Sequence, residues 1–382
     1  MKRVGLVTYY KENYGSVLQC YSTKHYLESL GLECHVLYRR YKSSISFERI
    51  SNILHHALKA LRYKGYLKQY MEMHKAMARE KGYLTEEAKS KLNDFIDKKI
   101  HPEGYSWQEL CQIGKDNTYI AFVAGSDQIW NASINVDPCY FLKFTRKDKR
   151  IAFAPSFGVA SIPAFNVKSV RDGIRGFDLI AVREETGERI VRQMSSVQTT
   201  RIADPVALLN KKEWQMFSAS FSRLEFKYIF VHFLNRPSRN AIQCINRIIE
   251  SCGLTAILFS YDYPEYSELK NAQRYNGDPV EYLALIDSAE CVCTDSFHST
   301  MFSMILNRKF FTFPRQYLHS SNQSSRIIDL LNRYSVSQYY ISDNKWELPD
   351  WTGFDWTNIN QKLEIEREKT RRYLAQNIKE RM

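Results

Sequence analysis

A histidine that lies among carboxyl and hydroxyl side chains is a candidate for proton transfer. The segment Thr294–Thr300 reads T-D-S-F-H-S-T and follows the apolar run Cys291–Cys293. This pattern predicts a buried strand that ends where a helix begins. At such a turn His298 could donate to a phosphate or act as an acid or base. A lone histidine is more often structural, so both interpretations stay open.

A second polar segment, Gly125–Asn131, follows a predicted strand that ends at Ala124 and reads G-S-D-Q-I-W-N. Open α/β sheets bind ligands at the carboxyl ends of their strands. Polar groups next to a tryptophan suit a sugar, and Asp127 is a candidate to orient or deprotonate a hydroxyl. The structural alternative is a helix cap made by Ser126 or Asp127.

Two further turns lie at strand ends. The sequence V-R-E-E begins at Val182, and Arg183 can make two parallel hydrogen bonds to a carboxylate or a phosphate. Its structural alternative is a salt bridge to a neighbouring glutamate.

The sequence N-Y-G-S-V-L-Q begins at Asn13, after the first predicted strand. A glycine turn before a helix offers N–H groups to an anion, but such turns are more often structural.

Length and composition narrow the class of protein. The 382 residues exceed one ordinary hydrophobic core and predict two domains. The formal net charge of +12 favours anionic partners, and without zinc-finger or RNP-type motifs a nucleic-acid binder is the least favoured. The eight cysteines form no C-x-x-C pair, and no stretch approaches a membrane span of ~20 apolar residues. We expect a cytoplasmic protein that needs no metal or cofactor.

Predicted strands alternate with predicted helices along most of the chain, which is typical of parallel doubly wound sheets. The predicted strands span residues 4–9, 34–38, 119–124, 150–154, 178–182, 228–233, 256–260, 290–294 and 310–313. We expect an α/β protein with two Rossmann-like domains that face a cleft. The first domain spans residues 1–215 and the second spans 216–355. Residues 356–382 form a charged helix that is expected to pack back on the first domain.

A basic helical insertion is predicted at about residues 39–118. Its apolar residues recur at helical spacing, namely Ile50, Ile53, Leu54, Ala57, Leu58 and Leu61. One interpretation is a surface helix whose apolar face packs on the domain, and it is favoured because ordinary surface helices show this pattern. The other is a basic amphipathic segment that touches an anionic membrane or a lipid-linked substrate.

Taken together, these segments resemble the polysaccharide pyruvyl transferases in order and spacing, over most of the chain. The resemblance rests on the motifs at 13–19, 125–131, 156–158, 182–185, 204–205, 278–283, 294–298 and 326–331. Two positions depart from the family pattern. Ser299 stands where a glycine is usual, and we expect its side chain to narrow the approach of a ligand. Pro155 stands before Ser156 in place of a small residue.

The resemblance implies a GT-B-like fold and transfer of pyruvate from phosphoenolpyruvate to a sugar, free or lipid-linked, of a cell-surface polysaccharide precursor. It implies a pyruvate ketal as product, release of phosphate, and a cytoplasmic enzyme, either soluble or peripheral at the membrane. The residues assigned from it are His298, Asp127 and Asp295 for catalysis, Arg183, His298, Ser296 and Arg326 for the donor, and Asn13, Tyr14, Gln19, Gln128 and Trp130 for the acceptor.

Two other functions fit the same residues. A glycosyltransferase that uses a nucleotide sugar would also place arginine and histidine against phosphates, and fold alone does not separate the two. A non-catalytic partner in glycan assembly would bind no donor.

Overall fold

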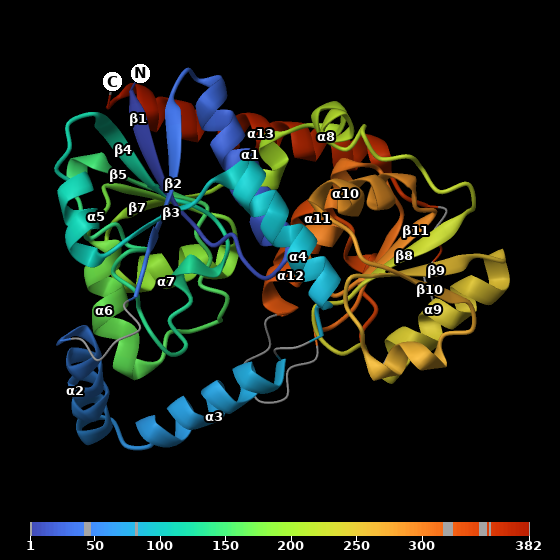
Figure 1. The fold of residues 1–382 in the computed structure, drawn as a ribbon, viewed down its shortest axis with the longest axis horizontal. Helices are drawn as coiled ribbons and strands as arrows, with labels where there is room; N and C mark the ends of the chain where they lie inside the picture. The colour runs from blue at the N-terminus through green and yellow to red at the C-terminus, as the bar shows by residue number, and fades with distance from the viewer. Residues whose placement is uncertain are drawn as a thin grey trace.

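The computed structural model describes residues 2–41, 47–80, 83–315, 324–343, 350 and 353–381. Two sheets, each built from parallel strands, lie side by side, with helices on their faces and between them (Figure 1). The α/β prediction is therefore confirmed.

The first sheet has seven strands in the order β3-β2-β1-β4-β5-β6-β7, all parallel. Its strands are β1 (Arg3–Val7), β2 (Glu33–Arg39), β3 (Glu103–Tyr105), β4 (Tyr119–Ala124), β5 (Arg150–Phe153), β6 (Leu179–Val182) and β7 (Gln198–Arg201). Its central strands are apolar on both faces because helices cover both sides of a parallel sheet.

The second sheet has five parallel strands in the order β10-β9-β8-β11-β12. Its strands are β8 (Tyr228–His232), β9 (Thr255–Phe259), β10 (Ala272–Tyr275), β11 (Cys291–Thr294) and β12 (Phe310–Thr312). In both sheets the strand order reverses beside the first strand, between β1 and β4 and between β8 and β11. Ligands bind at such switch points in open α/β sheets.

Thirteen α-helices are described. They are α1 (Tyr14–Ser29), α2 (Phe47–Arg62), α3 (Tyr66–Glu80), α4 (Glu86–Phe95), α5 (Trp107–Ile113), α6 (Ala164–Ile174), α7 (Glu185–Met194), α8 (Lys211–Phe217), α9 (Arg239–Cys252), α10 (Pro279–Ser288), α11 (Phe297–Ile305), α12 (Ser324–Tyr334) and α13 (Trp356–Lys379). None of these described helices is long and apolar enough to cross a membrane.

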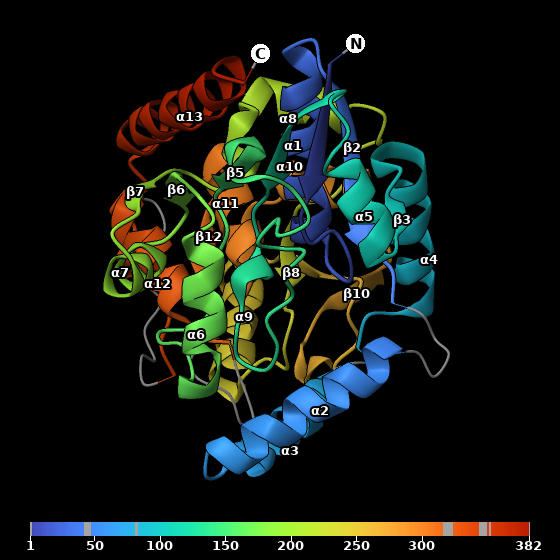
Figure 2. The same ribbon diagram turned by 90° about the vertical axis from the view of Figure 1, so that its left-hand side faces the viewer.

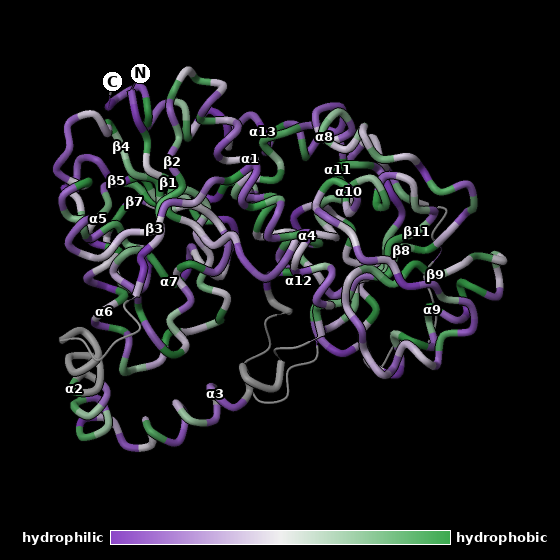
Figure 3. Tube along the Cα trace, in the orientation of Figure 1, coloured by the Kyte–Doolittle hydropathy of each residue, from purple (hydrophilic) through white to green (hydrophobic). Residues whose placement is uncertain are grey.

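Helix α1 joins the two halves. The Tyr14 ring stacks on Tyr282 of α10 with centroids 5.1 Å apart, and its hydroxyl donates to the Gly277 carbonyl at 2.6 Å. Figure 3 shows apolar residues concentrated along the strands of both sheets. Buried side chains of α1 and of both sheets form one continuous cluster, so the halves share a core.

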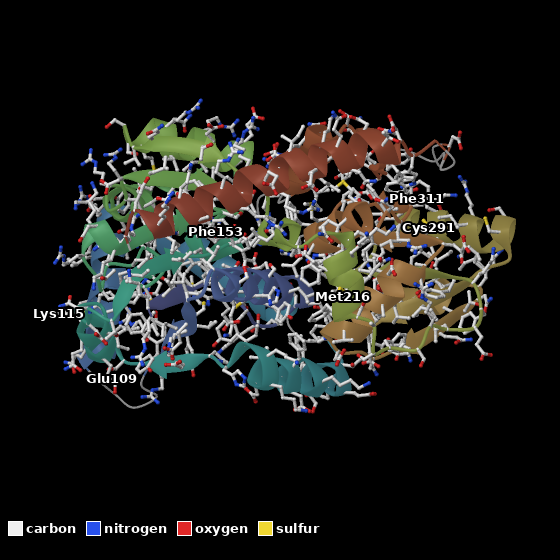
Figure 4. All side chains as sticks on the ribbon, turned by 90° about the horizontal axis from the view of Figure 1, so that it is seen from above. Glu109, Lys115, Phe153, Met216, Cys291 and Phe311 are labelled. Carbon is white, nitrogen blue, oxygen red and sulfur yellow. The ribbon has the colours of Figure 1, made fainter. Side chains whose placement is uncertain are left out.

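Helix α13 lies along both halves and returns to the first sheet (Figure 4). The Tyr373 hydroxyl donates to the Ala152 carbonyl at 2.9 Å, and its ring stacks near Phe153. The Arg381 guanidinium donates to the carbonyls of Asp148 and Arg150. These contacts tie the end of the described chain to β5.

The segment 39–118 differs from the prediction in two respects. It contributes the edge strand β3, which is too short and too polar to show alternation. The favoured packing of α2 is also wrong: Leu54, Leu58 and Leu61 are 59%, 64% and 86% exposed, so the predicted apolar face points to solvent. The side chains of Ile50 and Ile53 lie outside the described residues.

Candidate active site

The carboxyl ends of β4, β6 and β7 place a buried ionic cluster around Arg183. The Arg183 Nη1 atom lies 2.6 Å from Asp204 Oδ2, and Nε lies 3.2 Å from Glu184 Oε2. Its Nη2 atom lies 3.7 Å from Asp127 Oδ1 and has no hydrogen-bond partner in the described part of the chain. Its guanidinium also stacks over the Phe297 ring at 4.5 Å. The salt-bridge interpretation of Arg183 is thus what the structure shows.

Asp127 is held in an unfavourable backbone conformation with φ of 66°. Its Oδ1 accepts from the Gln128 N–H at 2.8 Å, and its Oδ2 accepts from the Ser16 hydroxyl of α1. Burial alone would raise the pKa of Asp127, but Arg183, His298 and the Ser16 hydrogen bond outweigh it and lower the pKa. The carboxylate is therefore ionised at neutral pH and anchored by a helix distant in sequence.

His298 reaches this cluster from α11 in the second half. Its Nε2 atom is buried, lies 3.6 Å from Asp204 Oδ2, and has no hydrogen-bond partner among the described residues. Burial would raise the pKa of Asp204, but His298 and Arg183 lower it well below its usual range. The histidine of the second half therefore faces a buried carboxylate of the first half.

The glycine of the N-Y-G turn makes room for this histidine. A Cβ atom on Gly15 would lie 2.2 Å from Cγ and Nδ1 of the His298 ring. A glycine is therefore needed at position 15, where the two halves approach each other closely. The sequence shows this glycine, but it does not show that His298 is the residue packed against it.

Replacing Gly15 with alanine should lower the free energy of unfolding by about 1–3 kcal/mol and reduce activity, because the new methyl group displaces the His298 ring. Gly187→Ala in α7 is the matched control, since its Cβ would meet its nearest neighbour at 3.4 Å. Urea denaturation of both variants measures the difference. Equal stabilities would contradict the packing of His298 on this turn.

Arg326 approaches the cluster from α12. With the Gln128 amide oxygen turned toward it, that oxygen accepts from Nη1 and Nη2 of Arg326 at 3.2 and 3.0 Å. The neighbouring Asp329 accepts from the Thr186 hydroxyl at 3.2 Å. The structure therefore brings Asp127, Gln128, Arg183, His298 and Arg326 together.

Asp295 and Ser296 contact the protein backbone rather than the ionic cluster around Arg183. Asp295 accepts from the backbone N–H groups of Leu234 and Asn235 at 2.7 and 3.0 Å, and Arg315 Nε lies 3.7 Å away. Burial raises the pKa of Asp295 despite these partners. The Ser296 hydroxyl caps α11 by accepting from the Ser299 N–H. Asp295 thus fixes the loop after β8.

Most residues predicted to bind the acceptor make structural contacts within the protein. Asn13 caps α1, and Gln19 is buried with its amide bonded to Thr8 and Tyr9. Trp130 is buried against Phe141, and its indole N–H donates to a backbone carbonyl. Tyr14 lies between the halves, as described above. In this structure Tyr14, Gln19 and Trp130 therefore pack in the interior, where no sugar reaches them.

Ser299 does not narrow the ligand approach, contrary to expectation. Its hydroxyl points into the second half, 2.8 Å from His232 Nδ1 and 2.7 Å from the Tyr282 hydroxyl. Burial lowers the pKa of His232 to about 3, so this imidazole is neutral. The serine at this position completes an internal hydrogen-bond network.

Two hollows beside the cluster contain residues that the sequence reasoning missed. A cleft of about 940 Å³ between the halves is lined by Lys11, Lys89, Tyr261 and Arg315, among others, and by Asn13, which was predicted for the acceptor. A smaller pocket of about 220 Å³ adjoins it and is rich in tyrosine; its lining includes Tyr9, Tyr10, Tyr38, Tyr41 and Tyr140. The available signal was the tyrosines that cluster at the ends of the first two strands, Tyr9 and Tyr10 after β1 and Tyr38 and Tyr41 at the end of β2.

The described residues include no group of three or more His, Cys, Asp or Glu side chains arranged to hold a metal ion. The three carboxylates of the central cluster instead share the Arg183 guanidinium as an ion-pair partner.

Comparison with solved structures defines the fold. UDP-N-acetylglucosamine 2-epimerase from Rickettsia bellii is similar with a TM-score of 0.51 and 9% identity, over 99% of this chain and 97% of that one. UGT89C1 from Arabidopsis thaliana is similar with a TM-score of 0.51 and 10% identity, over 97% and 94%. Both support the GT-B fold, which confirms the fold prediction. At such identity they speak to the fold alone.

The sequence itself defines the family. The family sequence model of the polysaccharide pyruvyl transferases matches residues 13–317, which is most of the chain. This protein belongs to that family, and the predicted resemblance is confirmed. No curated protein matches the sequence.

Proposed function

We propose that this protein transfers the pyruvate unit of phosphoenolpyruvate to two hydroxyls of one sugar in a polysaccharide precursor. Membership of the family supports the transferase class. The observation that carries the proposal is the buried His298 Nε2, which lacks a hydrogen-bond partner among the described residues and faces Asp204 at the first turn of α11. A proton donor beside a helix N-terminus suits an anionic, proton-accepting substrate.

The chemistry needs one proton donor and acceptors for two hydroxyl protons. C3 of phosphoenolpyruvate gains a proton and becomes a methyl group, which leaves C2 electron-poor. One sugar hydroxyl adds to C2, phosphate departs with the C–O electron pair, and the second hydroxyl closes the ketal. Of the two hydroxyl protons released, one replaces the proton given to C3 and the other leaves with phosphate. His298 is assigned the protonation of C3.

Asp127 is assigned to orient a sugar hydroxyl. Because its pKa is lowered, its carboxylate is a weak base but a strong hydrogen-bond acceptor. Arg183 acts as a positioning residue, since its contacts hold Asp127 and Asp204 in place. Arg326 remains the cation that we assign to the donor, together with the N–H groups at the start of α11.

The tyrosine-rich pocket is assigned to the acceptor sugar. Tyrosine rings present flat apolar faces with a polar end, which suits a sugar ring. The pocket lies next to the cluster, because Thr8 in its lining donates to the carbonyl of Ser126, the neighbour of Asp127, at 2.8 Å.

Tyr140→Ala should raise the KM for the acceptor about tenfold and leave the KM for phosphoenolpyruvate unchanged, because one sugar-contacting face is lost. Tyr26→Ala, a half-buried tyrosine where α1 meets α13, is the control. Steady-state kinetics with each substrate varied in turn separates the two constants. A rise in the donor KM alone would remove the pocket from the acceptor site.

Donor preference tests the proposal against a nucleotide-sugar glycosyltransferase. Thermal denaturation should show stabilisation by millimolar phosphoenolpyruvate that is lost in Arg326→Ala, and no comparable stabilisation by UDP or UDP-sugars. Stabilisation by UDP-sugars without any by phosphoenolpyruvate would replace the proposal with a glycosyltransferase. No stabilisation by either would favour a non-catalytic partner.

A further inference from the structure

Helices α2 and α3 are joined by a short turn, run at a large angle to each other and lie apart from both sheets (Figures 1 and 2). This pair is called the α2–α3 hairpin below. It is attached to α6 by polar and aromatic contacts. The Lys59 ammonium is buried and donates to Asn166 Oδ1 at 2.7 Å, and Asn166 in turn donates to the Ala132 and Ile134 carbonyls. The buried Tyr66 ring packs edge-on against Phe165, with centroids 4.8 Å apart. The side of the hairpin that faces the protein is therefore partly polar.

The opposite side of the hairpin is apolar and exposed. At about 100° per residue, Leu54, Leu58 and Leu61 fall within an arc of roughly 60°, and Lys59 lies on the other side of α2. In α3, Leu67 and Met71 are one turn apart and also exposed. Half of the strongly exposed large apolar side chains in the described part of the protein lie in this hairpin. A helix pair whose lysine faces the protein and whose leucines face solvent needs another surface to cover it.

Basic side chains border this apolar face. By the same helical geometry, Arg62 lies about 80° from Leu54, and Lys75 and Lys68 lie about 80° and 100° from Leu67. All three are exposed, and residues 47–80 carry seven Lys or Arg against three Glu. Cations flanking an apolar stripe match a lipid surface, where leucines enter the acyl boundary and long basic side chains reach anionic headgroups.

We infer that the α2–α3 hairpin docks this protein on an anionic lipid surface through Leu54, Leu58 and Leu61, with Arg62, Lys68 and Lys75 at the headgroups. The charge pattern favours lipid over a second copy of the chain, because pairing two such faces would bring like charges together. The inference stands on the hairpin alone and does not depend on the proposed transfer reaction.

Vesicle flotation of the full chain tests it without any enzyme substrate. Vesicles of phosphatidylcholine with phosphatidylglycerol should bind the protein, while pure phosphatidylcholine should bind it about tenfold or more weakly. The triple variant L54E/L58E/L61E should lose about tenfold or more of the binding to anionic vesicles. M216E/I365E, which alters two exposed apolar side chains elsewhere, should bind like the wild type.

Circular dichroism and thermal denaturation establish that the triple variant is folded. Should it fail to fold, R62A/K68A/K75A replaces it, and salt at 0.5 M should then weaken wild-type binding to the same extent. The inference would be overturned if the wild-type protein did not bind anionic vesicles. It would also be overturned if both triple variants bound these vesicles as strongly as the wild type. A wild-type dimer in analytical ultracentrifugation that the leucine variant turns into a monomer would instead assign this face to a second copy.

Discussion

Replacing His298 with glutamine should lower kcat by about 10²–10⁴-fold, because an amide keeps a hydrogen-bonding group but cannot supply a proton. The structure places this imidazole against Gly15 and 3.6 Å from the Asp204 carboxylate, so the substitution removes proton transfer at the centre of the cluster. Initial rates of phosphate release, with the acceptor that supports wild-type turnover, measure the effect.

The control is His25→Gln, an exposed histidine on α1. It should keep wild-type rates. Stabilisation by phosphoenolpyruvate should persist in the His298 variant at raised donor concentration, since Arg326 and the start of α11 remain. A His298→Gln protein with a wild-type kcat would remove the histidine from the chemistry.

Replacing Arg183 with methionine should lower the free energy of unfolding by about 3–5 kcal/mol at pH 7. The substitution leaves Asp127, Asp204 and Glu184 buried without their shared cation, and an uncompensated buried charge is costly. Urea denaturation followed by circular dichroism measures the loss. Arg146→Met, which breaks an exposed pair with Asp148, should change stability by no more than about 1 kcal/mol.

The loss caused by Arg183→Met should shrink as the pH falls from 7 toward 4. In the wild type the pKa values of Asp127 and Asp204 are lowered, so these carboxylates stabilise the fold above their unfolded pKa of about 3.9, and that contribution disappears below it. In the variant Asp127 has lost the largest influence that opposes burial, so burial raises its pKa and stability falls as pH rises through that pKa. Asp204 keeps His298, which lowers its pKa more than Arg183 does. A loss independent of pH would contradict the electrostatic role of Arg183.

The sequence predicted the inner strands of both sheets but not three of the four edges. Strands β3, β7 and β10 lie at sheet edges, and their sequences E-G-Y, Q-T-T-R and A-Q-R-Y are short and polar. Edge strands expose unpaired backbone groups, and polar side chains there prevent pairing with another chain, so a search for apolar runs overlooks such strands. The fourth edge, β12, was found because its F-F-T sequence is buried.

The site was predicted at the level of segments rather than contacts. In the structure Asp127 and His298 both lie beside the cluster, since Arg183 contacts Asp127 and Asp204, and Asp204 faces His298. The contacts of Ser16 with Asp127 and of Gly15 with His298 join residues more than 100 positions apart, and local pattern carries no information on such pairs. Trp130 was misjudged because polar neighbours suggested a surface, whereas its indole packs on Phe141.

The most direct test is a transfer assay with purified protein, phosphoenolpyruvate and a panel of nucleotide-linked and lipid-linked sugars. We expect acceptor-dependent release of one phosphate per product, a product whose mass exceeds that of the acceptor by one pyruvic acid less water, and a ketal methyl signal in its proton NMR spectrum. A donor that stabilises the protein yet leaves every acceptor unmodified, while UDP-sugars yield a glycosylated product, would contradict the proposed transfer.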